Sequence, residues 1–92
     1  MAHLLVDLVA ADRKIWSGEA SMVSAPAADG EIGILPGHAP VLAVLRAGEV
    51  RVTPVSGAPV RGTVGGGFLS VDANRVTIVA DSVTMTSGAS AN

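Results

Sequence analysis

The chain has 92 residues and no cysteine, and its six Lys and Arg against eight Asp and Glu leave a formal net charge of −2. This length allows one domain built around one hydrophobic core. The basic residues are scattered along the sequence, so we expect no nucleic-acid partner. The lack of cysteine excludes disulfides and thiolate metal sites and is typical of cytosolic proteins.

The sequence predicts neither a bilayer-spanning segment nor a signal peptide. No stretch approaches the roughly 20 consecutive apolar residues that a membrane helix requires, and no cationic region precedes the first apolar run. Apolar residues make up 49% of the chain, whereas aromatic residues make up 2%. A core built mainly from Val, Leu, Ile and Ala favours strands, so we expect a soluble β protein with no direct bilayer insertion.

The N-terminal part of the chain predicts one clear strand followed by two turns. Residues 4–10 form an apolar run interrupted by Asp7, which we interpret as a strand with Leu4, Val6, Leu8 and Ala10 on one face and Leu5, Asp7 and Val9 on the other. Residues 11–14 form a polar corner, and Ser17-Gly18 predicts a second turn shortly afterwards. Between these turns, we expect Trp16 to cover the core.

Three further segments lead to the middle of the chain. Residues 19–25 alternate weakly, and we expect Val23 and Ala25 to face inward. A turn is predicted at residues 26–30, where Asp29-Gly30 is a hairpin signal. Residues 41–45 are almost entirely apolar, which implies cover on both faces, by the core on one side and by sheet or a partner on the other.

The second half of the chain reads as a succession of short strands. Residues 49–53 and 60–64 form an antiparallel pair, with Val50 and Val52 facing inward. The glycines at residues 65–67 allow a bend, and residues 75–80 close the sheet with an inward face made of Val76, Ile78 and Ala80. The pattern predicts an all-β sandwich or flattened barrel over residues 1–81, followed by a polar, flexible tail at residues 82–92.

The residues around which the chain is organised are 30–40, which carry three glycines, two prolines, Glu31 and His38. Pro36 and Pro40 lack an N–H group and restrict the residues before them, while Gly37 allows a tight turn. We therefore expect His38 to be displayed at a rigid corner. A rigid loop loses little entropy when it is engaged, so this loop is suited to contacting another molecule.

Catalytic and metal-binding interpretations of the same residues are weaker. His3 and His38 do not have the spacing of a zinc site, and the three glycines at 65–67 are not followed by the Lys-Ser or Lys-Thr of a phosphate-binding loop. An acid/base pair of Glu31 and His38 would lie on the rim of a small sandwich with no room for a pocket. We expect no enzymatic activity, no metal and no cofactor, and an interaction role instead.

Four sequence blocks, in order, carry a resemblance to a known family. They are Ile-Trp-Ser-Gly at 15–18, Gly-Glu-Ile-Gly-Ile-Leu-Pro-Gly-His-Ala-Pro at 30–40, Gly-Gly-Gly-Phe-Leu-Ser-Val at 65–71 and Val-Thr-Ile-Val-Ala-Asp at 76–81. Over residues 4–81, the chain resembles the epsilon subunit of the rotary ATP synthase.

This resemblance implies a sandwich of about ten strands at the foot of the central stalk, on the cytoplasmic face of the bacterial plasma membrane. Such a subunit catalyses nothing. It binds the gamma subunit and the membrane ring of c subunits, and it helps couple proton flow to ATP synthesis. By the family's pattern, the ring-facing residues are Gly30, Glu31 and His38, and the gamma-facing residues are Ala10, Val41, Leu42 and Ala43.

One departure and one alternative accompany the resemblance. Most members continue into two C-terminal helices that restrain ATP hydrolysis and in some members bind ATP. These properties are not carried over, because residues 82–92 hold no such helices. The alternative is a stand-alone β-sandwich that binds a small ligand or another protein, which predicts a concave apolar pocket and no need for gamma.

Overall fold

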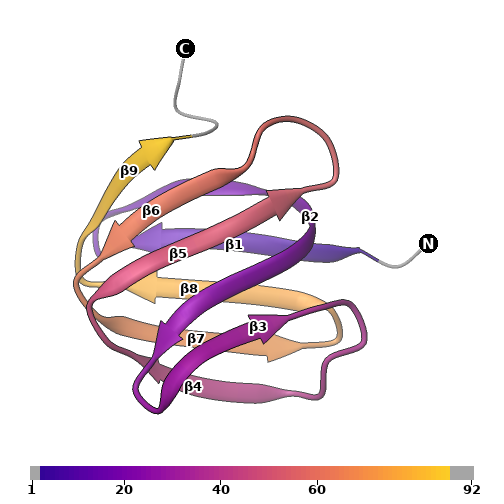
Figure 1. Ribbon diagram of the computed structural model, residues 1–92, viewed down its shortest axis with the longest axis horizontal. Coiled ribbons are helices and arrows are strands. Elements are labelled where there is room, and N and C mark those ends of the chain that lie inside the picture. Colours follow the sequence, from indigo (N-terminus) through magenta and orange to yellow (C-terminus); the bar gives the residue numbers. More distant parts are fainter. Residues whose placement is uncertain (1–2, 88–92) are drawn as a thin grey trace.

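The computed structural model describes residues 3–87, and within them every regular element is a strand (Figure 1). The nine strands are β1 (Leu4–Ala10), β2 (Arg13–Ala27), β3 (Gly30–Ile34), β4 (Val41–Leu45), β5 (Gly48–Pro54), β6 (Val60–Val64), β7 (Gly67–Asp72), β8 (Arg75–Ala80) and β9 (Val83–Ser87). The predicted all-β class, with about ten strands, is thus confirmed.

The strands form two layers that share one long strand (Figure 1). The first layer contains β1, β8, β7 and β4, and the second contains β3, β2, β5, β6 and β9. The beginning of β2 pairs with β1, whereas its end pairs with β3 and β5 and reaches β4 at Ala27. This double pairing of β2 closes the sheet into a flattened barrel.

Inward-facing residues of both layers fill the core, as their alternation predicts. The inward positions predicted on three strands are buried, namely Val23 and Ala25, Val50 and Val52, and Val76, Ile78 and Ala80. On β1, the face made of Leu4, Val6, Leu8 and Ala10 is the buried one. Trp16 is half-buried and packs against this core. No polar or charged residue is buried among the described residues, so the interior is uniformly apolar.

The turn predicted at Ser17-Gly18 is wrong, because β2 runs without a break from Arg13 to Ala27. The glycine there has a packing role instead. A Cβ atom on Gly18 would lie 3.0 Å from an atom of the Trp16 indole, which shows that the ring lies against the glycine. The turn predicted at residues 26–30 is also shorter than expected, since only Ala28 and Asp29 separate β2 from β3.

The ordered sheet extends beyond the domain boundary expected at residue 81. Strand β9 pairs antiparallel with β6, so residues 83–87 belong to the second layer and not to a flexible tail. This strand was hard to predict, because few of its residues are large and apolar. The rest of the predicted tail, at residues 88–92, lies outside the described residues.

The expected bend at the three glycines is observed, and one of them permits a close backbone approach. Gly67 begins β7 with a φ of +142°, and a Cβ atom at this position would collide with the carbonyl oxygen of Val79 on β8. Only a residue without a side chain fits there. The glycine thereby allows β7 and β8 to pair up to the bend.

Candidate interaction surfaces

Two of the three residues predicted to face the ring, Gly30 and Glu31, lie on the edge strand β3, and the third, His38, lies beyond it. Gly30 follows the two-residue loop after β2, Glu31 is opposite Pro26, and His38 lies in the segment beyond the far end of the strand. A strand rises by about 3.3 Å per residue. Glu31 and His38 therefore flank the strand from opposite ends, and the structure does not bring them together as an acid/base pair.

Glu31 is exposed and contributes to a charged group of side chains on the outer surface of the second layer. It lines a hollow of about 390 Å³ together with Ser24, Pro26, Arg46, Gly48, Glu49 and Arg51. The Arg51 Nε atom donates a hydrogen bond to Glu49 Oε1 over 2.9 Å. This hydrogen bond and the Glu49 charge raise the pKa of Arg51, and the charge of Glu31 adds a smaller contribution. The negative charge of Glu31 thus lies near a cation of its own chain.

His38 is half-buried in a short segment, residues 35–40, that connects β3 to β4. Its backbone N–H donates to the carbonyl oxygen of Leu35 over 3.1 Å, which closes a tight turn. Gly37, in the middle of this turn, has a φ of +89°. The His38 Nδ1 atom lies 2.7 Å from the carbonyl oxygen of Ala39, so one ring nitrogen is already engaged within the segment.

The four residues predicted to face gamma differ in their exposure. Ala10 is buried, Val41 and Ala43 are half-buried, and Leu42 is 71% exposed. Strand β4 therefore alternates, with one face toward the core and the other toward solvent. Within the described residues, nothing covers the outer side of Leu42 or of Val44, which is 66% exposed.

Residues of the other first-layer strands continue this exposed apolar surface, and reasoning from the sequence missed them. Val44 is opposite Phe68, Phe68 is opposite Val79, and Val79 is opposite Val9. Phe68 is 44% exposed, and the two valines toward β1 are half-buried. We call Val9, Leu42, Val44, Phe68 and Val79 the apolar face. Only the strand register reveals it, because its members come from four separate strands.

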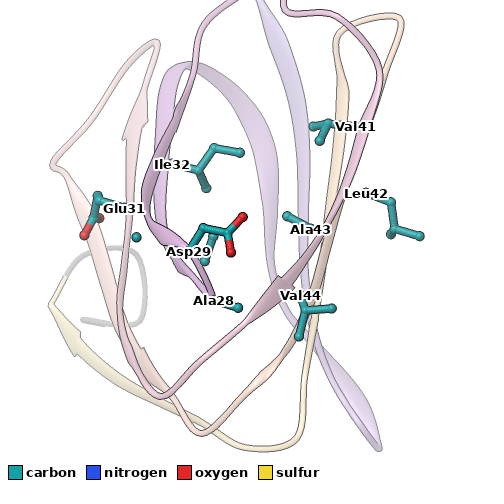
Figure 2. A pocket seen from close by; sticks show the side chains of 10 residues that line it. Ala28, Asp29, Glu31, Ile32, Val41, Leu42, Ala43 and Val44 are labelled. Carbon is teal, nitrogen blue, oxygen red and sulfur yellow. The ribbon is translucent and has the colours of Figure 1, made fainter.

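A second hollow, of about 490 Å³, separates the edges of β3 and β4 (Figure 2). It is lined by residues 27–32 and 41–44. Figure 2 shows the carboxylate of Asp29 directed into the space between the two strands, while Leu42 and Val44 point away from it. Asp29 and Glu31 are both exposed, so this hollow combines apolar walls with two acids.

The described residues contain no group of three or more His, Cys, Asp or Glu side chains that could hold a metal ion. Over residues 3–87 there is also no helix long and apolar enough to cross a membrane. The side chain of His3 lies near Glu19, with 3.7 Å between Nδ1 and Oε1. The described surface therefore has two candidate contact regions, namely the edge at β3 that carries Glu31 and the apolar face.

A small sandwich with such surfaces is typical of a subunit that works by contacting other proteins, and comparisons with known proteins identify the family. The family model described as "ATP synthase, Delta/Epsilon chain, beta-sandwich domain" matches residues 3–86. The chain belongs to this family, which supplies ATP synthase with a non-catalytic subunit.

Two bacterial relatives illustrate the similarity, and both are named ATP synthase epsilon chain. The protein of Rhodococcus erythropolis is 51% identical over 86 residues, which cover 92% of this chain and 70% of the relative. The protein of Micrococcus luteus is 53% identical over 91 residues, which cover 99% of this chain and 100% of the relative.

Solved structures show the same fold at lower identity. A chain of the Euglena gracilis mitochondrial ATP synthase, in a structure of OSCP, F1 and c-ring, has a TM-score of 0.86 and 23% identity, covering 92% of this chain and 54% of that one. A chain of the Tetrahymena thermophila mitochondrial ATP synthase, in a structure of the central stalk and c-ring, has a TM-score of 0.78 and 18% identity, covering 88% of this chain and 65% of that one.

Proposed function

We propose that this chain is a non-catalytic rotor subunit of a proton-translocating ATP synthase, bound to gamma through its apolar face and to the c-ring through the edge at β3. In this position it helps couple proton flow to ATP synthesis at the cytoplasmic face of the bacterial plasma membrane. The observation that carries the proposal is the apolar face. A folded chain of this family exposes large apolar side chains together on one layer, as expected of a surface that a partner covers.

The gamma contact is centred on Leu42 and extends to Val44 and Phe68. Burying each of these exposed side chains against a partner contributes at most about 1.5–3 kcal/mol. Association itself costs several kcal/mol, so a few such residues at the centre dominate the affinity. Val41, Ala43 and Ala10 support this surface from the core side and set the shape of the strands beneath it.

The ring contact runs along β3, with Gly30 and Glu31 at one end and His38 at the other. A carboxylate on the rim can pair with a basic side chain of the ring and fix the docking register. Glu31 and Arg51 line the same hollow, so a cation of the ring would approach Glu31 beside a positively charged side chain of the same subunit. His38 adds a hydrogen bond through the ring nitrogen that does not face Ala39.

Titration of the purified chain with its cognate gamma subunit tests the gamma contact. We expect one-to-one binding that the double variant Leu42→Ser, Val44→Ser weakens at least tenfold. The matched control is Val55→Ser, which removes an exposed apolar side chain from the segment after β5, outside the apolar face. A folded chain that does not bind gamma, or a double variant that binds like the control, contradicts the proposal.

The hollow between β3 and β4 favours a second candidate, a stand-alone sandwich that holds a ligand between two strand edges. Its apolar walls and its two lining acids, Asp29 and Glu31, suit an apolar ligand with a cationic group. The gamma titration separates the two functions. Only the stand-alone module would remain a folded monomer in the presence of gamma.

A further inference from the structure

The turn between β7 and β8 consists of two residues that both have a left-handed backbone. Ala73 has a φ of +49° and Asn74 a φ of +64°, and the flanking Asp72 and Arg75 are paired. Two positive φ angles in a two-residue hairpin loop define a type I′ turn. Asparagine adopts this conformation readily, but glycine would serve the turn equally well.

Asn74 makes two contacts outside its own hairpin. Its side-chain Oδ1 accepts a hydrogen bond of 2.8 Å from the backbone N–H of Gly37. Its backbone carbonyl oxygen accepts another of 2.8 Å from the N–H of Leu5, at the start of β1. One turn residue therefore joins β1, the β7–β8 hairpin and the segment at residues 35–40.

The segment at residues 35–40 has few other means of holding its shape. Pro36 and Pro40 cannot donate backbone hydrogen bonds. The bonds described for His38 stay within the segment, to Leu35 and Ala39. Among the hydrogen bonds described for these residues, the one from Gly37 to Asn74 is the one that ties the segment to another element.

We propose that Asn74 is a positioning residue that fixes the segment at residues 35–40, and thereby places His38 for its contact with the ring. The proposal rests on the function proposed above only for the identity of the partner. Without the amide oxygen, the N–H of Gly37 loses its acceptor, and none of the hydrogen bonds described for the segment then ties it to another element. Asn74 then acts on the ring through His38 and does not touch the ring itself.

Two substitutions separate the role of the amide from the role of the turn. Asn74→Gly keeps the left-handed backbone and removes the acceptor, whereas Asn74→Asp keeps both an acceptor oxygen and a tolerance for positive φ. We expect the amide of Gly37 to exchange with solvent roughly tenfold faster in Asn74→Gly and at the parent rate in Asn74→Asp. The amides of β8 should be unchanged in both variants, which confirms that the hairpin stays folded.

The functional measurement is binding of each full-length variant to detergent-solubilised cognate c-ring. Asn74→Gly should bind severalfold more weakly than the parent chain, and Asn74→Asp should restore the affinity. Unchanged exchange at Gly37 in Asn74→Gly overturns the proposal, and so does parent-like ring affinity despite faster exchange. If the parent chain itself does not bind the ring, the proposed ring contact fails, and the exchange rates alone decide whether Asn74 fixes the segment.

Discussion

The outer surfaces of the two layers differ sharply although the layers share one core. On the first layer, the outward residues Val44, Phe68 and Val79 are opposite one another across three strands. On the second layer, the corresponding outward positions include Glu49 opposite Thr63 and Arg51 opposite Arg61. Burial of the inward residues fixes the fold in both layers, so the outward residues are free to differ, and the contrast supports the different partners proposed for the two surfaces.

The substitution with the largest expected effect disrupts the first layer from within. Gly67→Ala places a Cβ atom against the carbonyl oxygen of Val79, where the backbone cannot yield without breaking the β7–β8 pairing. We expect a loss of about 3–5 kcal/mol in the free energy of unfolding, measured by urea denaturation. Gly57→Ala is the control, because Gly57 also has a positive φ but open space around it, and it should lose only about 1 kcal/mol. Equal losses would mean that the close approach at Gly67 is not what constrains it.

A substitution in β8 compares the inward and outward sides of one strand. Ile78 is fully buried, so Ile78→Ala should lower the free energy of unfolding by about 2–5 kcal/mol. The neighbouring Thr77 faces outward and is half-buried, and Thr77→Ala should cost less than about 1 kcal/mol. A loss near zero for Ile78→Ala in the same denaturation experiment would contradict the assignment of the two faces.

The inward sides were predictable because alternation is a local property. Alternation over only a few residues predicts the burial of Val50 and Val52, and likewise of Val76 and Ile78. The β9 strand was not predictable in this way, because its place is set by pairing with β6 and not by its own apolar residues. The prediction of a turn at Ser17-Gly18 was wrong for a related reason. Gly18 leaves room for the indole of Trp16 within a continuous strand and does not turn the chain.

The candidate surfaces depend even more on long-range register. The sequence places Glu31 and His38 seven residues apart, but only the fold shows that the strand between them is an edge strand paired with β2 alone. It likewise gives no sign that Val44 and Phe68 are neighbours, or that Asn74 holds Gly37. Local patterns indicated only that residues 30–40 suit a contact and that residues 41–45 need cover, whereas the identity of the partners came from the family resemblance.

Substitution of Phe68 tests whether gamma binds the apolar face of the first layer and not the outer surface of the second. Phe68→Ala should weaken gamma binding by about 1–2 kcal/mol, roughly tenfold, because it removes a large side chain near the centre of the proposed contact. Its effect on the free energy of unfolding should be smaller, since the ring is 44% exposed. Thr63→Ala, on the outer side of the second layer, is the control and should leave the affinity unchanged. Isothermal titration with gamma would measure both, and equal affinities would remove Phe68 from the contact.

The edge at β3 should respond more weakly and in a different manner. Glu31→Ala should reduce the affinity for the c-ring by about 0.5–1 kcal/mol without changing the free energy of unfolding, because an exposed charge contributes to docking more than to stability. The reduction should shrink as salt is raised, whereas the effect of Phe68→Ala on gamma binding should persist. Asp12→Ala removes an acid from the turn after β1 and serves as the control. Unchanged ring affinity at low salt would remove Glu31 from the site.

The smallest expected effect concerns the turn that carries Asn74. Ala73 has a φ of +49°, a conformation that disfavours a residue with a Cβ atom. Ala73→Gly relieves this strain but increases the freedom of the unfolded chain, so we expect a net gain of about 0.5 kcal/mol in the free energy of unfolding. Neither hydrogen bond of Asn74 involves Ala73, so the exchange rate of the Gly37 amide should stay at the parent value. A faster rate would show that the backbone of the turn, and not only the amide of Asn74, determines how residues 35–40 are held.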